Sequence, residues 1–202
     1  YIRDIINNRM RGALGGIVMN DDMFSTKIDH EWSAWVQAYG GWNKIDGNGN
    51  YADVKHSTGG FLVGADTIAE NGWLAGAFAG YSNSTIKADA RASSASVDSF
   101  HVGAHVAKEW NGNIALRLGV ANSWHKVDTE RTAAFFGFGP QSPTSNANAR
   151  TFQAFGEVAY KIHAKKITLE PYGNLAYVNH HTGAYNEDGG AAALRGSKTR
   201  TS

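Results

Sequence analysis

The chain of 202 residues lacks cysteine, has three prolines and carries a formal net charge of only +1. Without cysteine it has no disulfide framework, no thiolate metal site and no cysteine nucleophile. The near-zero charge gives no electrostatic case for nucleic acid as a partner. It also lacks an apolar run of the roughly 18 residues that a transmembrane helix needs. No proline-rich or charged linker divides it, so we expect one large domain.

What the chain does have is alternation of apolar and polar residues. In residues 100–106 and 114–120 the even positions are apolar, while His101, Gly103, His105, Arg117 and Gly119 occupy odd positions. Successive side chains of a strand point to opposite faces, so each segment predicts a strand with one apolar face. The mean hydropathy of −0.37 is polar. A membrane β-barrel also has a polar composition, because half of each strand lines a wet lumen.

The spacing of the predicted strands favours a membrane barrel over a soluble β-sheet protein. Candidate strands cover residues 34–45, 58–68, 73–85, 97–110, 114–126, 150–162 and 167–179, and a further strand is expected to start near Ala191. Many of them reach the roughly 9–11 residues that a tilted strand needs to cross a bilayer. Predicted long loops at 46–57, 86–96 and 127–149 alternate with short turns at 69–72, 111–113 and 163–166. Long loops at one end and short turns at the other are typical of outer-membrane barrels.

The alternation then assigns two faces to the predicted barrel wall. The expected lipid-facing residues are Phe100, Val102, Val106, Leu116, Leu118 and Val120. The expected lumen residues are Asp66, His101, His105, Arg117, Glu157 and Glu170. Tryptophans such as Trp42, Trp73, Trp110 and Trp124 fall towards strand ends, which suits the aromatic girdles at membrane interfaces. Each tryptophan taken singly would equally fit the core of a soluble barrel.

The first residues follow a helical period instead. Ile2, Ile5, Ile6, Met10 and Leu14 lie on or near one helical face, and Gly15-Gly16 is a stop signal. A helix of this length spans roughly 21 Å, comparable to the height of a barrel wall. It would fit inside the lumen, where its arginines would meet the carboxylates of Asp66, Glu157 or Glu170. The polar residues of this pore helix are Arg3, Asn7, Arg9 and Arg11. A surface helix or a disordered leader fits the same pattern.

Several short motifs follow one another along the predicted strands. They are residues 35–42 (WVQAYGGW), 58–66 (TGGFLVGAD), 71–73 (NGW) with 80–82 (GYS), 169–178 (LEPYGNLAYV) and 189–194 (GGAAAL). In this order they resemble a known family, the translocator domains of bacterial autotransporters, which perform type V secretion. The resemblance implies an all-β antiparallel barrel of twelve strands with a helix in its pore. It also implies outer-membrane lipid, a secreted passenger N-terminal to Tyr1, and the barrel-assembly machinery with periplasmic chaperones as partners. The expected division is 1–16 as pore helix, 17–33 as linker and 34–202 as barrel.

The predicted strands stop at part of an eighth, so we expect a monomeric fragment whose last strands are missing. Two other classes remain as alternatives: a small outer-membrane porin or adhesion barrel, and a soluble ligand-binding β-barrel.

Catalysis is the competing function. His125 with Asp128 and Glu130 is the best material for an active site, but no nucleophile-elbow, HExxH or phosphate-loop motif is present. His101 and His105 share a face yet stand roughly 13 Å apart, too far to bind one ion together. Some translocators cleave their own passenger at an Asn-Asn bond, and Asn7-Asn8 is such a pair, but its flanking residues do not clearly match that subgroup. We therefore assign no catalytic, metal or cofactor residues and expect a non-enzymatic domain.

Overall fold

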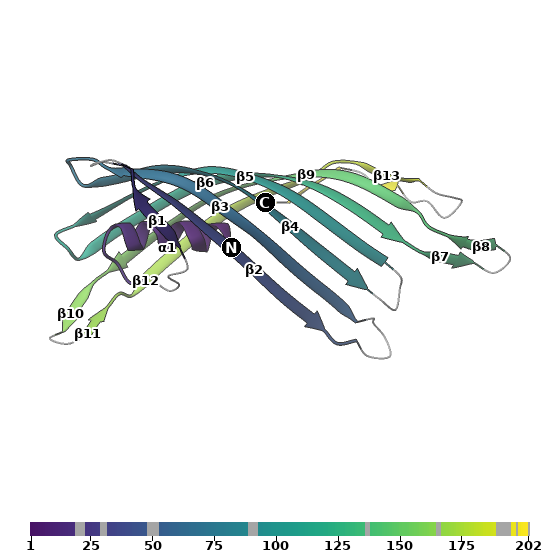
Figure 1. The fold of residues 1–202 in the computed structure, drawn as a ribbon, viewed down its shortest axis with the longest axis horizontal. Helices are drawn as coiled ribbons and strands as arrows, with labels where there is room; N and C mark the ends of the chain where they lie inside the picture. Colours follow the sequence, from purple (N-terminus) through teal and green to yellow (C-terminus); the bar gives the residue numbers. More distant parts are fainter. Residues whose placement is uncertain are drawn as a thin grey trace.

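A curved antiparallel sheet with one helix against its concave face makes up the computed structural model of the chain (Figure 1). The structure describes residues 1–18, 23–28, 32–47, 53–88, 93–135, 138–164, 167–188, 195–196 and 198–201. The helix is α1 (Ile2–Ala13). The strands are β1 (Phe24–Lys27), β2 (Trp32–Ile45), β3 (Val54–Ile68), β4 (Trp73–Ala88), β5 (Ser93–Trp110), β6 (Ile114–Arg131), β7 (Ala133–Phe135), β8 (Phe138–Gln141), β9 (Thr144–Tyr160), β10 (Ile162–Ala164), β11 (Ile167–Leu169), β12 (Tyr172–Thr182), β13 (Tyr185–Asp188), β14 (Arg195–Gly196) and β15 (Thr199–Thr201).

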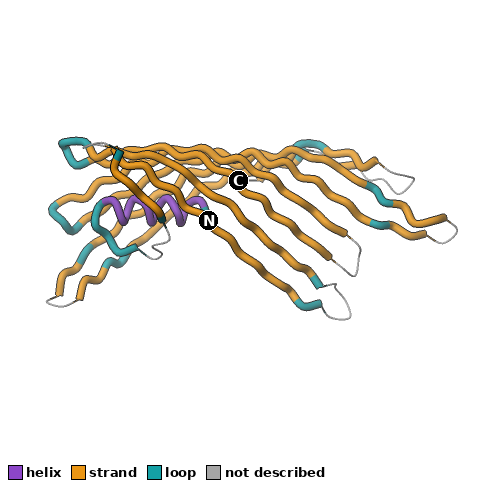
Figure 2. Tube along the Cα trace, viewed as in Figure 1, coloured by secondary structure: helices purple, strands orange, loops and turns teal. Residues whose placement is uncertain are grey.

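The strands of the main sheet follow one another in chain order along the path β1-β2-β3-β4-β5-β6-β9-β12-β15, while β7-β8 and β10-β11 form separate two-stranded sheets. Every pairing along the path is antiparallel. Within the described residues the two ends of this path are not paired with each other, so the sheet forms an open trough (Figure 2). The fold class predicted from the sequence was an antiparallel β-barrel, only partly represented in this chain, with an N-terminal helix. An all-β antiparallel sheet with one N-terminal helix is confirmed, and the described part of this sheet is not closed.

The two faces of the wall differ sharply in exposure along one strand. On β5, Phe100 is 61% exposed and Val102 43%, whereas His101 is 5% exposed and His105 2%. The concave face buries its residues because α1 covers part of it. Ile5, Ile6 and Met10 of α1 form one core cluster with residues of the sheet.

Glycine makes room for the aromatic residues of this core. On the concave face Phe78 lies directly opposite Gly103, and Phe155 directly opposite Gly119. A Cβ at Gly103 would lie 2.3 Å from the Phe78 ring, and one at Gly119 would lie 2.4 Å from the Phe155 ring. No side chain fits there, so each aromatic ring covers the backbone of the next strand.

Tight turns connect the strands at one end of the wall, as the sequence predicts. Asn111 and Gly112 have φ angles of 52° and 68°, and the N–H of Asn113 donates to the carbonyl of Trp110 at 3.1 Å. Two consecutive positive φ angles are the requirement of the hairpin turn that Asn-Gly sequences favour. Gly72, with φ of 79°, closes the β3–β4 turn in a similar way.

The loops predicted at 46–57, 86–96 and 127–149 are shorter in the structure, because the strands continue well past their apolar stretches. β4 reaches Ala88 and β5 begins at Ser93, and β6 reaches Arg131 while β9 begins at Thr144. Polar side chains pair across these extensions: Thr129 Oγ1 lies 2.6 Å from Ser145 Oγ, and Asn146 donates to Asp128 at 2.6 Å. Backbone ladders need no apolar residues, so alternation in hydropathy could not locate these ends.

Two further boundaries were wrong. The stretch predicted as one strand over 167–179 is broken at Glu170-Pro171, and β12 begins after it at Tyr172 and reaches Thr182. Proline has no N–H for the ladder, although its carbonyl accepts from the N–H of Tyr160 at 3.0 Å. In the predicted linker, β1 pairs with β2, a strand that the sequence reasoning missed. The predicted strand start near Ala191 lies outside the described residues.

Candidate functional site

The helix α1 is held against the concave face by ion pairs at its C-terminal half. It ends at Ala13, and Gly15, with φ of 69°, lets the N–H of Gly16 return to the carbonyl of Arg11 at 2.7 Å. Glycine favours this left-handed conformation after a helix, as the Gly15-Gly16 stop signal predicts. The chain then passes directly over charged residues of β6 and the β11–β12 turn.

The first ion pair joins α1 to β3. Arg9 donates from Nε and Nη2 to the two carboxylate oxygens of Asp66, each at 2.7 Å. Asp66 is 2% exposed, and His105 Nε2 of β5 lies 3.6 Å from its Oδ2. A bidentate arginine–carboxylate pair fixes both direction and distance, so this contact sets the position of the helix relative to β3.

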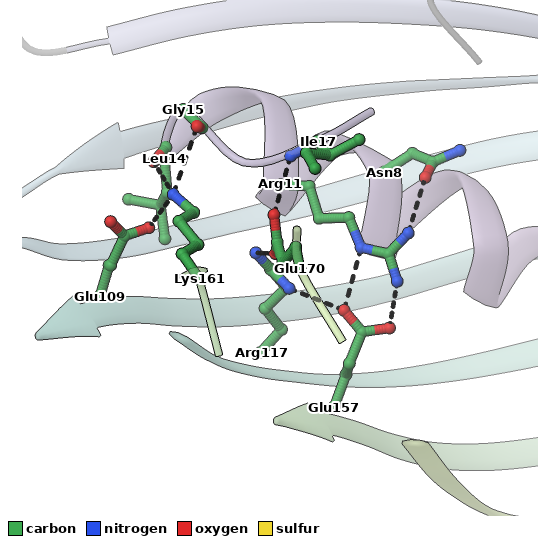
Figure 3. Close-up of polar contacts among 10 residues, drawn as sticks. All are labelled: Asn8, Arg11, Leu14, Gly15, Ile17, Glu109, Arg117, Glu157, Lys161 and Glu170. Atoms are coloured by element: carbon green, nitrogen blue, oxygen red, sulfur yellow. Dashed lines mark hydrogen bonds and ion pairs between the residues drawn. The ribbon is translucent and has the colours of Figure 1, made fainter. Parts of the chain in front are cut away.

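The second ion pair is the centre of a buried chain of alternating charges (Figure 3). Arg11 donates from Nε and Nη2 to the carboxylate of Glu157 on β9. Arg117 of β6 extends this series of charges. Its Nη1 donates to Glu157 Oε1 at 2.8 Å, and its Nη2 donates to Glu170 Oε1 at 2.7 Å. Arg117 is fully buried and Glu157 is 1% exposed. A buried charge is tolerated only where partners satisfy it.

Glu170 continues this chain back to the segment after the helix. Its Oε2 accepts a hydrogen bond from the backbone N–H of Ile17 at 2.9 Å. Burial opposes ionisation of the Glu170 carboxyl, but this hydrogen bond and the Arg117 guanidinium together hold its pKa below the ordinary value. Glu170 was expected on a lumen stripe of a strand; it lies instead in the break before β12.

The third ion pair involves Lys161, which follows β9. Lys161 Nζ lies 3.2 Å from the carbonyl oxygen of Gly15 and 3.4 Å from that of Leu14, and it pairs with Glu109 of β5. The unpaired carbonyls at a helix C-terminus attract cations. Figure 3 shows Lys161 reaching from Glu109 to this end of the helix.

The residues singled out from the sequence do not all belong to this network. Arg3 is paired with Asp4 of its own helix, and Asn7 is buried with its side-chain oxygen unpartnered in the described part of the chain. His101 lies elsewhere on the concave face, between Ser82 and Ser123 at 2.9 and 2.8 Å. Phe100, Val102, Val106, Leu118 and Val120 are exposed on the convex face, and Leu116, half-buried, alternates in step with them.

Sequence reasoning missed Lys161, Glu109 and Tyr172 as parts of the site. The ring of Tyr172 packs 4.4 Å from the guanidinium carbon of Arg11. Lys161 falls just after a strand end, where alternation gives no face assignment. Glu109 sits at an odd position on β5, in step with His101 and His105, and that signal could have identified it.

Metal ions and membrane-spanning helices have no visible counterpart here. Among the residues that the structure describes, no group of three or more histidine, aspartate or glutamate side chains is placed to hold a metal ion. No helix in the described ranges is long and apolar enough to cross a membrane.

An antiparallel wall with an apolar convex face and a charged concave face is typical of outer-membrane β-barrels, some of which hold a helix inside. Residues 34–202 match the family model described as the autotransporter beta-domain, and the chain belongs to that family. It is an outer-membrane translocator and anchor domain for a passenger.

Proteins with similar sequences and folds agree with this membership. Two proteins of Serratia marcescens, each named "Extracellular serine protease", are 36% and 34% identical over 200 residues, which is 98% of this chain. The chain spans 18% of the length of these relatives. The translocator domain of autotransporter NalP from Neisseria meningitidis superimposes with a TM-score of 0.70 at 17% identity, over 99% of this chain and 65% of that one. That likeness is one of fold.

Proposed function

We propose that residues 1–16 form the plug of a secretion pore, that 17–33 link it to the wall, and that 34–202 belong to the wall. In this proposal Phe100, Val102, Val106, Leu116, Leu118 and Val120 face lipid. Asp66, His101, His105, Arg117, Glu157 and Glu170 face the lumen. The passenger lies N-terminal to Tyr1 and is secreted through the barrel, and α1 is the segment that connects it to the membrane domain. The observation that carries the proposal is Arg11 of α1 donating twice to the buried carboxylate of Glu157.

The physical argument is the cost of buried charge. Arg9 and Arg11 are 9% and 5% exposed. Removing one partner from a buried pair costs about 3–5 kcal/mol. Two bidentate pairs therefore favour a helix held inside the pore over a helix that diffuses away from it. The domain itself is proposed to be non-catalytic, and its partners to be outer-membrane lipid, its own passenger, the barrel-assembly machinery and periplasmic chaperones.

The two relatives named as extracellular serine proteases suggest which passenger to test first. The segment upstream of Tyr1 is proposed to be a secreted protein, and a protease assay on cell supernatants is the direct examination. The same experiment distinguishes release by cleavage at Asn7-Asn8 from continued attachment. The mass of the passenger and the N-terminal sequence of the barrel give the answer.

The test of the plug is deletion of residues 1–14 from the full-length barrel, followed by single-channel recording in planar bilayers. Conductance should rise, and the temperature at which the barrel unfolds should fall, because the helix and its ion pairs are lost together. The matched control is Arg3→Gln, since Arg3 is paired with Asp4 and not with the wall; it should leave conductance unchanged. Unchanged conductance after the deletion would refute the plug while leaving the family membership intact.

A further inference from the structure

One register row on the convex face changes from aromatic to basic as it crosses the sheet. Residues directly opposite each other in antiparallel strands point to the same face. The row consists of Phe61, Tyr81, Phe100, Trp124, Arg150, His181 and Arg200, from β3 to β15. Phe61, Phe100 and Trp124 are 45%, 61% and 45% exposed. The three basic residues that follow, on β9, β12 and β15, are here called the basic row.

The basic row lies where the apolar band of the wall ends. On β9 the convex-facing residues between Arg150 and Tyr160 are Phe152, Ala154, Gly156 and Val158, none of them charged. About ten residues at ~3.4 Å each, tilted by ~40° to the barrel axis, give a height of ~26 Å, close to the ~25 Å apolar band of outer-membrane barrels. Arg150 therefore marks the loop end of that band and Tyr160 the turn end.

The two arginines of the basic row have no carboxylate to neutralise them within the described residues. Arg150 donates from Nε to Asn122 Oδ1 at 2.7 Å, and its guanidinium carbon lies 5.8 Å from the ring centre of Trp124. These contacts orient Arg150 without cancelling its charge. The nearby carboxylates accept hydrogen bonds from other residues: Asp98 from Tyr81 and Asn83, and Asp128 from Asn146.

Arg150 and Arg200 stand two strands apart on either side of His181, so two like charges share one row of the convex face. Strands lie about 4.8 Å apart, so the row extends over roughly 10 Å. A ligand with several phosphates on one headgroup matches that length, whereas a lipid with a single phosphate reaches only part of it. An anion of this kind would relieve the repulsion within the row.

We propose that the basic row binds the phosphate groups of lipopolysaccharide, the phosphorylated glycolipid of the outer leaflet, with Trp124 and Phe100 against its apolar part. This rests on the proposed function in one respect: the loop end of the wall must face the cell exterior. Lys108 provides a contrast at the turn end, where its ammonium lies 5.4 and 5.6 Å from the ring centres of Trp73 and Trp110.

The experiment compares the folded full-length protein with the variant R150Q/H181Q/R200Q and with K108Q, which removes one convex-face cation from the opposite end. Retention of purified lipopolysaccharide is measured on the purified protein. Affinity should fall about fivefold for each arginine removed, as expected for a cation near an anionic membrane surface, and K108Q should bind as the parent does. Heat-modified gel mobility reports whether each variant has folded, and single substitutions replace the triple variant if it has not.

Two further probes separate the possible ligands. Dephosphorylated lipid A should bind the parent weakly, and neither phosphatidylglycerol vesicles nor inorganic phosphate should compete with lipopolysaccharide. Equal affinity of parent and triple variant, equal loss in K108Q, or equal competition by phosphatidylglycerol would each overturn the proposal. Passenger secretion and cysteine labelling of the loops are scored separately, so a reversed orientation is recognised independently of the binding measured on purified protein.

Discussion

Arg117 of β6 and Glu157 of β9 stand directly opposite each other in the sheet and form an ion pair of 2.8 Å with no exposure of either side chain. The same carboxylate accepts both donors of Arg11. Glu157 therefore joins two strands of the wall to the helix inside it, and a change at this one residue affects both.

Glu157→Gln should lower the free energy of unfolding by about 3–5 kcal/mol, because the buried Arg11 then lacks a charged partner and Arg117 keeps only Glu170. The measurement is urea unfolding of the folded barrel in detergent. The control is Asp46→Asn, which breaks the exposed pair between Lys44 and Asp46 and should cost at most about 1 kcal/mol. Equal effects of the two substitutions would contradict the role assigned to Glu157.

Acidification should loosen the segment after the helix before it unfolds the wall. The pKa of Glu170 is lowered in the folded protein, so its contribution is fully present above the ordinary carboxyl value of 4.5 and is lost as the pH falls through the lower folded pKa. Single-channel recording between pH 7 and pH 3 should show more frequent open events at the acid end. Glu170→Gln should show them at neutral pH and lack the acid step; an identical acid step in that variant would exclude Glu170 as its origin.

Substitutions on the two faces of β6 should differ in cost. Leu118→Arg places a charge on the convex face near the middle of the apolar band, where it should cost about 2–4 kcal/mol, and Leu116→Arg should behave alike. A polar change at Ser123 that keeps the hydroxyl, Ser123→Thr, should be mild by comparison, because the hydrogen bond to His101 is retained. Equal tolerance of both faces in the complete barrel, measured by reversible unfolding in lipid, would argue against the proposed face assignment.

Cysteine labelling tests the orientation of the wall, and no native cysteine competes for the reagent. Single cysteines at Ser94 and Ser142 should react with a membrane-impermeant maleimide on intact cells, whereas one at Asn111 should react only after permeabilisation. A single cysteine at Asn48, which lies outside the described residues, is expected to react in the same way. Labelling of a cysteine in place of Asn111 on intact cells would show that the wall has the opposite orientation.

Replacing the glycine opposite Phe155 even by alanine should lower the stability of the fold. A methyl group at Gly119 would overlap the Phe155 ring at 2.4 Å, and overpacking of this kind costs about 1–3 kcal/mol. Gly173→Ala is the control, because nothing lies within 4 Å of its added Cβ. Thermal unfolding of the two variants should separate them, and similar midpoints would show that the ring moves aside freely.

The strands that cross the apolar band were predictable, because there one face meets α1 and the core while the other is exposed, as at His101 and Val102. The outer parts of β4, β5, β6 and β9 were not, because hydroxyl and amide side chains such as those of Thr129 and Ser145 maintain the ladder without an apolar period. The break at Pro171 was visible in the sequence but lay inside a convincing alternation. Choosing among Asp66, Glu157 and Glu170 as partners for each arginine needed the three-dimensional register.

The order of the contacts along α1 also determines how the helix responds to mechanical force. Arg9 and Arg11 lie in its C-terminal half, and Lys161 contacts the carbonyl groups of Leu14 and Gly15 just after it. At the other end, the described ion pairs of Tyr1 and Arg3 stay within the helix, and the contacts with the wall are the stacking of Tyr1 on Tyr39 and the apolar packing of Ile5 and Ile6. Tension applied at Tyr1 would therefore act first on ring and apolar contacts and only then on the ion pairs of Arg9 and Arg11, which resist the pull together.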